Sequence, residues 1–208
     1  MLEGRSYARA LNTYHELKTR KQDMRFLTII WVVALTTACA PDPAKVENVA
    51  TAEASRLRAP SQPLSSFSRF ELEPMTFSQP IMAEEGKMRE AREFEIAYNL
   101  RIRGLLDKWN TNVQSGARDT LVVRTELVGL RIISGAARFW AGAFAGDSFL
   151  DLDLILVNKN TGEQISNVRV RKNADAMGGA WSVGQTDQNL DQYVIEIVRT
   201  YLSNSYQP

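Results

Sequence analysis

Two aspartates, Asp151 and Asp153, are the residues of this chain whose type and spacing best suit chemistry. They lie in the run FLDLDLILV, whose alternating apolar residues predict a strand, so both carboxylates should point to the same face. Paired carboxylates can bind a metal ion or serve as acid and base in glycoside cleavage. With Asp147, the other acidic residue nearby, they form the candidate site of a carboxylate-dependent enzyme.

A structural role accounts for the same two aspartates. Arg169 and Arg171 have the same spacing on the run that should pair with the first strand. Each arginine could therefore face one aspartate across the ladder, as on the solvent face of an antiparallel sheet. We expect this ion-paired arrangement, and we predict neither a metal site nor a cofactor.

A glycine-rich segment, residues 135–148, precedes that strand. A phosphate-binding loop would have a lysine before its serine, and Asp147 stands there instead, so phosphate binding is not predicted. The small residues favour close packing before the strand, and a partner-binding surface is the alternative. Trp181, in a second glycine-rich loop, either fills the core beneath the last helix or forms a binding lip with Met177.

The candidate binding surface joins aromatic and basic residues of both glycine-rich segments. Its members are Arg138, Phe139, Trp140, Phe144 and Trp181. A small ligand could bind there only if the two tryptophans share a cleft.

The stretch Met24 to Cys39, MRFLTIIWVVALTTAC, resembles a bacterial lipoprotein export signal. Arg25 gives a positive start, an apolar run follows, and the final four residues resemble a lipobox, with Thr36 where leucine is common. The apolar run is shorter than the roughly 20 residues that a membrane span requires. The resemblance implies cleavage before Cys39 and attachment of lipid to its thiol. Residues 1–23 are either a mis-assigned start or a long positive region, and we exclude residues 1–38 from the fold.

Removal of residues 1–38 changes which chemistry the chain could support. It leaves 19 basic and 21 acidic residues, a formal net charge of −2, which does not favour nucleic acid as a partner. It also removes His15, the only histidine, while lipid would occupy Cys39, the only cysteine. Histidine- or cysteine-based catalysis, zinc ligation by these residues and a disulfide within the domain are therefore excluded.

The remaining sequence predicts one domain of mixed structure. Residues 39–66, rich in Pro, Ala and Ser, predict a flexible tether after the lipidated cysteine, and residues 67–205 predict a single α/β domain. The predicted order is a strand near residue 70, a helix over 83–109, one bent or two short strands over 121–133, a hairpin over 149–172 and a last helix from residue 187. This order predicts an α+β two-layer sandwich, with two helices on one face of a mixed or antiparallel sheet.

Several short motifs resemble a family of small bacterial lipoproteins known only as a domain of unknown function. They are Gly135-Ala136-Ala137-Arg138, the run from Ala141 to Gly146, the Leu-Asp-Leu strand and the turn NKNTG at residues 158–162. The resemblance covers residues 67–205 and implies no catalytic residues.

These observations together predict a non-enzymatic lipoprotein anchored to the outer membrane through Cys39 and facing the periplasm. The residue after the cysteine, Ala40, is not the aspartate that commonly retains such proteins in the inner membrane. The expected partner is an envelope protein or a cell-wall component. The alternatives are a carboxylate-dependent envelope hydrolase and a small-ligand binder.

Overall fold

The computed structural model describes residues 42–111, 119–132, 148–173 and 189–206. The chain divides into two units, Met1–Ala40 and Pro41–Pro208, and every described residue belongs to the second. None of the helices in the described ranges has the length and apolar character that a membrane span requires.

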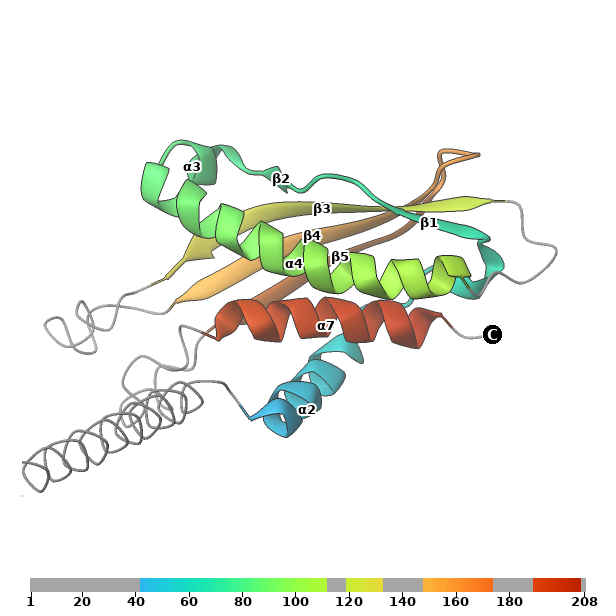
Figure 1. Cartoon of the computed structure of the whole chain (residues 1–208), viewed down its shortest axis with the longest axis horizontal. Coiled ribbons are helices and arrows are strands. Elements are labelled where there is room, and N and C mark those ends of the chain that lie inside the picture. Colours follow the sequence, from blue (N-terminus) through green and yellow to red (C-terminus); the bar gives the residue numbers. More distant parts are fainter. Residues whose placement is uncertain (1–41, 112–118, 133–147, 174–188, 207–208) are drawn as a thin grey trace, which may run out of the picture. The chain divides into compact units, whose positions relative to one another are not determined.

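A five-stranded mixed sheet forms the centre of the second unit (Figure 1). Its main order is β1 (Arg69–Leu72), β3 (Thr120–Arg131), β4 (Phe149–Asn158) and β5 (Gln164–Asn173). β1 and the short β2 (Thr76–Phe77) run parallel to β3, whereas the pairs β3–β4 and β4–β5 are antiparallel. The prediction of an α+β fold with a mixed sheet is confirmed.

β3 is one long strand with an irregularity at Gly129, which decides between the two alternatives for residues 121–133. The register with β4 shifts between Leu127 and Gly129. A Cβ at Gly129 would lie 3.0 Å from Phe149 Cε2 and 3.3 Å from Asp151 Oδ2, so any other residue would require these side chains to shift by a few tenths of an ångström. The glycine therefore permits the close approach of β4 at this bulge.

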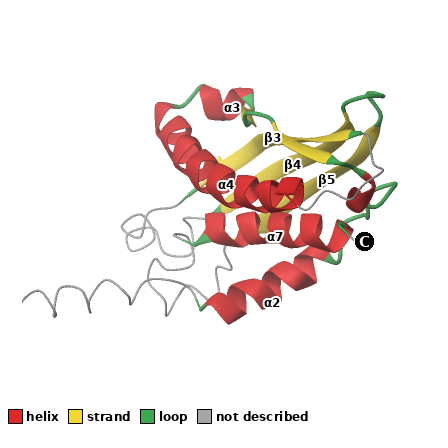
Figure 2. Cartoon of the chain, turned by 45° about the vertical axis from the view of Figure 1, so that its right-hand side comes forward, coloured by secondary structure: helices red, strands yellow, loops and turns green. Residues whose placement is uncertain are grey.

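Two long helices, α4 (Glu85–Thr111) and α7 (Leu190–Ser205), lie beside each other against the sheet (Figure 2). The Tyr98 hydroxyl of α4 hydrogen-bonds Thr125 Oγ1 of β3 at 2.9 Å, and the Tyr201 hydroxyl of α7 hydrogen-bonds Ser166 Oγ of β5 at 2.7 Å. Buried leucines of β4 lie between these two anchor points, and one hydrophobic core includes residues from both helices. A short helix, α3 (Gln79–Met82), precedes α4.

The apolar spacing of the helix predicts a buried stripe of Met88, Ala91, Glu95, Tyr98, Ile102, Leu105 and Trp109. The buried face of α4 differs from it at three positions: Met88 is only partly buried, Leu106 is buried in place of Leu105, and Glu95 is replaced. The sequence pattern placed Glu95 in the stripe, but Phe94 is buried in its place, and Glu95 forms an ion pair with Arg92 at 2.7 Å. Because a helix has 3.6 residues per turn, its buried residues can be either three or four positions apart. The Phe94 ring can therefore enter the core while the neighbouring Glu95 lies at the edge of the buried face.

The prediction of a flexible tether over residues 39–66 is wrong for the part that the structure describes. Pro43–Ala54 form helix α2, and a short 3₁₀ helix, η2, covers Leu64–Ser66. Three residues one helical turn apart, Val46, Ala50 and Ala54, are buried, and α2 packs against α7.

Local chemistry explains why this segment is helical. The Asp42 side chain accepts a hydrogen bond from the Ala44 backbone N–H at 3.0 Å, which caps the helix. Pro43 occupies the first turn, where its missing N–H costs nothing. The chain after α2 is also fixed, because the Ser61 N–H bonds the Ile165 carbonyl at 2.9 Å and the Tyr201 hydroxyl donates to the Arg58 carbonyl at 2.9 Å.

Candidate functional site

The two aspartates of β4 each face an arginine of β5, as the sequence predicted. Asp153 is directly opposite Arg169, and Asp151 is directly opposite Arg171. Arg169 donates from Nε and Nη2 to the two carboxylate oxygens of Asp153, both at 2.7 Å. This bidentate hydrogen bonding raises the pKa of Arg169.

Asp151 has a looser contact with its arginine. Arg171 Nε lies 3.4 Å from Asp151 Oδ1, but this buried oxygen accepts no hydrogen bond among the described residues. The contact is therefore an ion pair without hydrogen-bond geometry. Arg171 also lies over the Phe149 ring, 5.3 Å from its centroid, which holds the guanidinium along the strand.

A third carboxylate joins this face from β3. Glu126 is directly opposite Asp153 in the register, on the side away from Arg169. Ion pairing continues along the same strand, because Arg124 bonds Glu73 at 2.9 Å. This face of the sheet therefore carries charged side chains of both signs on three strands, with two carboxylates, Glu126 and Asp153, next to each other.

This arrangement offers little for acid–base chemistry at the two predicted aspartates. A carboxylate that attacks a substrate or activates water must be free to contact it, and each of these two aspartates instead faces an arginine of β5. Within the described ranges, no group of three or more His, Cys, Asp or Glu side chains could hold a metal ion. Asp147, the third member of the predicted carboxylate site, lies outside the described residues.

The remaining predicted site residues also lie outside the described part of the chain. They are Cys39, Arg138, Phe139, Trp140, Phe144, Met177 and Trp181.

One open groove of about 390 Å³ lies where the end of α2 and the following loop meet the last turns of α7. Leu57, Pro60 and Pro63 supply apolar surface, and Tyr201 and Asn204 supply polar groups. Burial raises the pKa of the Tyr201 hydroxyl, which already bonds Ser166 and Arg58. No sequence pattern indicated this groove, because most of its lining residues belong to the segment predicted as a tether.

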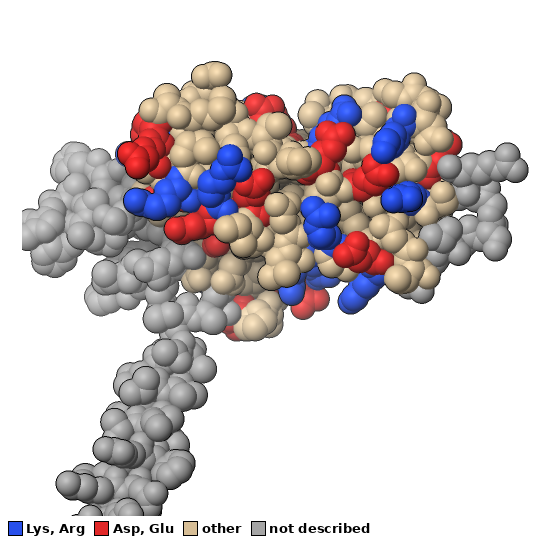
Figure 3. Space-filling model, turned by 45° about the horizontal axis from the view of Figure 1, so that its top comes forward, with Lys and Arg blue, Asp and Glu red and all other residues tan. Residues whose placement is uncertain are grey.

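The surface charges are mixed in sign where they can be seen in Figure 3. Blue Lys and Arg side chains alternate with red Asp and Glu side chains across this face, and neither sign forms a continuous patch. Ion pairs between neighbouring elements account for part of this pattern, such as Lys159 with Glu71 at 2.7 Å.

We expect a swap of the Asp153–Arg169 pair to be tolerated better than either single charge reversal. Asp153→Arg places two guanidinium groups opposite each other, and Arg169→Asp places an aspartate beside two others. Each single variant should lower Tm by on the order of 1–3 °C, and the double variant should recover most of that loss. Thermal unfolding of the four proteins measures the coupling, and additive effects of the two changes would contradict the pairing.

Comparisons with known proteins give a fold likeness at low similarity. No protein-family model matches the chain, and no curated protein matches it. Among solved structures, it is similar to the PelC dodecamer from Paraburkholderia phytofirmans, with 12% identity, 73% of this chain and 97% of that chain covered, and a TM-score of 0.42. A single-residue variant of the same protein gives 13% identity, 72% and 95% coverage, and a TM-score of 0.42. The hypothetical protein CT253 from Chlamydia trachomatis gives 7% identity, 66% and 99% coverage, and a TM-score of 0.32.

Proposed function

We propose that this chain is a periplasmic lipoprotein, anchored in the outer membrane through Cys39, whose α+β domain binds a component of the cell envelope without catalysing a reaction. The anchor is supported by the sequence from Met24 to Cys39, with its positive start, apolar run and lipobox-like end. Ala40 in the position after the cysteine supports the outer membrane.

The observation that carries the choice of binding over catalysis is the pairing of the two candidate aspartates. Asp153 is held by a bidentate arginine, and Asp151 faces a second arginine at 3.4 Å. A carboxylate enzyme needs one acid that is protonated and one that is free to attack or to activate water. Both aspartates instead have the partners of structural ion pairs.

Helix α2 changes how such an anchor would hold the domain. Only three residues separate Cys39 from Pro43, the first residue of α2. Four extended chain steps span at most about 14 Å. A lipid on Cys39 would therefore hold the domain against the membrane surface. A flexible coil over residues 39–66 would instead allow a separation of about 30 Å.

Crosslinking in intact cells tests the binding function. We expect the full chain to capture a specific envelope protein or cell-wall fragment, and the variant Asp153→Asn to capture the same partner. The matched control is Glu85→Gln, which removes a carboxylate from an exposed position of α4 away from the sheet. Cleavage of cell-wall material by the wild-type chain that is lost in Asp153→Asn but kept in the control would instead establish the hydrolase.

A further inference from the structure

The outer face of α4 exposes two large apolar side chains one turn apart. Ile96 is 70% exposed and Leu100 is 80% exposed, near the middle of the helix. In Figure 1 no described element passes in front of α4. The core does not require these side chains, because the buried face of α4 lies on the opposite side of the helix.

The two apolar residues belong to a longer stripe with regular spacing. The exposed residues Arg89, Glu93, Ile96, Leu100, Arg103 and Asp107 follow one another at steps of four and three. This alternation is the seam of a coiled coil, on which every residue faces a partner helix. The stripe is about 27 Å long at 1.5 Å per residue.

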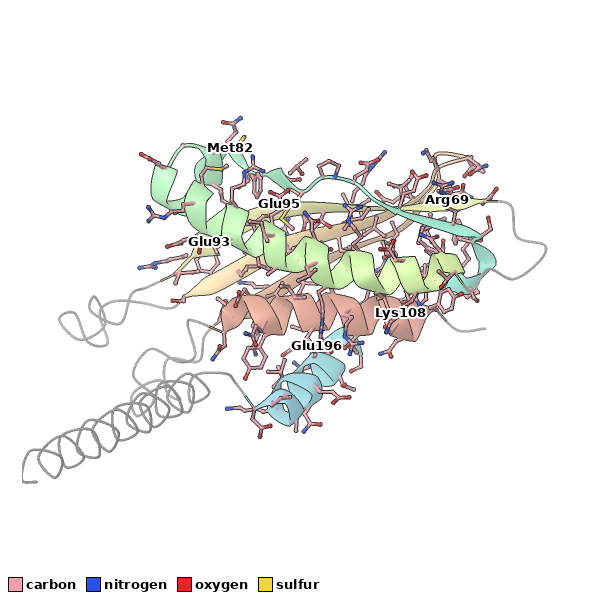
Figure 4. All side chains as sticks on the ribbon, in the orientation of Figure 1. Arg69, Met82, Glu93, Glu95, Lys108 and Glu196 are labelled. Carbon is pink, nitrogen blue, oxygen red and sulfur yellow. The ribbon has the colours of Figure 1, made fainter. Side chains whose placement is uncertain are left out.

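The four charges of this stripe, which we call the α4 stripe, have no ion-pair partner among the described residues. Other charges of α4 do have partners: Arg92 pairs with Glu95, Lys87 with Glu84, and Arg101 with Glu196 of α7. Figure 4 labels Glu93 and Glu95 on this helix, and only Glu95 has an ion-pair partner in the described part of the chain. The α4 stripe thus combines exposed apolar surface with charged side chains that form no ion pair in the described part of the chain.

The order of residue types along the α4 stripe is self-complementary when read in opposite directions. A two-fold axis at the level of residue 98 places Ile96 opposite Leu100 of a second copy. The same axis places Glu93 opposite Arg103 and, at each end, Arg89 opposite Asp107. Each acid therefore meets a base, and the apolar residues meet at the centre.

We propose that the α4 stripe is a homodimer interface, in which two copies of this chain pack their α4 helices antiparallel about a two-fold axis near residue 98. Four apolar side chains form its centre, and four ion pairs flank them. A parallel arrangement would place each charge opposite its own copy, which is repulsive at all four charged positions. A membrane surface would leave the alternating charges without complement, so a second copy is the partner that fits.

The small apolar centre makes this a weak dimer in dilute solution. Stable interfaces bury about 1,600 Å² in total, and a single helix pair supplies less. Crosslinking in cells that produce the full chain is therefore the appropriate measurement.

Two differently tagged copies test the register. Glu93→Cys in one copy and Arg103→Cys in the other should form a disulfide-linked heterodimer on mild oxidation, with Cys39 kept in both copies as the site of the lipid anchor. Glu93→Cys paired with Asp107→Cys is the matched control and should give at least about tenfold less product, because these positions lie a turn out of register. Equal yields, a Glu93→Cys homodimer, or a crosslink to a different envelope protein would each overturn the proposal.

Side-chain variants test the energetic basis. Ile96→Asn should lower the yield of the correct crosslink about tenfold, because it removes an apolar contact from the centre. Met82→Asn, which changes a 46% exposed methionine on α3 outside the stripe, should leave the yield unchanged. Glu93→Arg should weaken the dimer and Glu93→Arg with Arg103→Glu should restore it, as followed by amine crosslinking. A yield that is insensitive to Ile96→Asn and to charge reversal would contradict the proposal.

Discussion

Replacement of Ala50 by arginine is expected to detach α2 from α7 and to lower the free energy of unfolding by about 2–3 kcal/mol. Ala50 is fully buried. The arginine side chain would have to enter the packed region between α2 and α7, where its guanidinium would have neither space nor an acidic partner. The released segment should also become sensitive to thermolysin between residues 43 and 66, at a much lower protease concentration than in the wild-type chain.

The matched control is Ala52→Arg, two residues along the same helix. Ala52 is exposed, so the same substitution there should change the free energy of unfolding by less than about 0.5 kcal/mol and leave protease resistance intact. If the two variants behaved alike, residues 43–66 would be a tether, and the account of α2 as part of the domain would be wrong.

Truncation of Tyr98 is the second change with a large expected effect. Tyr98 is fully buried on α4, its ring lies 5.8 Å from that of Phe94, and its hydroxyl bonds Thr125. Tyr98→Ala should lower the free energy of unfolding by about 3–5 kcal/mol, as a cavity of this size usually does. Burial raises the pKa of the Tyr98 hydroxyl, so the group stays neutral and able to donate throughout the physiological range.

Two further variants separate the ring from the hydroxyl. Tyr98→Phe keeps the ring and leaves the Thr125 hydroxyl without this partner, so we expect a loss of about 1–2 kcal/mol. Leu100→Ala, on the exposed side of the same helix, should change monomer stability by less than about 0.5 kcal/mol at low protein concentration. Denaturant unfolding of the three variants checks the order. A loss for Tyr98→Ala no larger than that for Leu100→Ala would contradict the packing of α4 on β3.

The sheet and its ion-pair ladder could be predicted because period-two patterns and a turn determine them together. The alternation around Asp151 and Asp153 placed both on one face, and the turn after Asn158 set which residues of the next strand they oppose. Gly162 has a φ of 75°, as such a turn requires, and the Asn158 side chain accepts from the Asn160 N–H at 2.9 Å. Local sequence therefore determined a contact between residues 16 positions apart.

Helix α2 could not be predicted in the same way, because its helical face is made of small residues. Two of its three buried residues are alanines, so the segment lacks the apolar stripe by which amphipathic helices are recognised. The prolines favoured a linker, although Pro43 is at a position where helices accept proline. The partner surface on α7 supplies the remaining stabilisation, and a contact between segments so far apart in sequence leaves no local pattern.

The outer side of α4 carries a second regular pattern in the sequence, besides the pattern of its buried face. The exposure of Ile96 and Leu100 is evident only once the residues of the buried face are known. The six residues of the α4 stripe follow one another in the sequence at steps of four and three. Steps of four and three on the side opposite the buried face are the pattern that indicates such a surface in a long helix.

The proposed lipid anchor and the proposed antiparallel helix pair support each other in one physical respect. Tethering two copies to the same bilayer raises their effective concentration, which favours an interface too small to be stable in dilute solution. The contributions of the tether and of the helix contact to dimer formation can be measured separately. Cys39→Ser removes the tether, and Ile96→Asn removes the apolar contact.

Mass spectrometry of the amino-terminal peptide from the membrane fraction tests the central claim most directly. The account predicts that the chain isolated from a Gram-negative host begins at Cys39 and carries a diacylglyceryl group on the thiol. It also predicts that radiolabelled palmitate enters the wild-type chain and is absent from Cys39→Ser. A chain that retains residues upstream of Cys39, or palmitate labelling that persists in Cys39→Ser, would contradict the lipid anchor and with it the proposed place of this protein in the cell envelope.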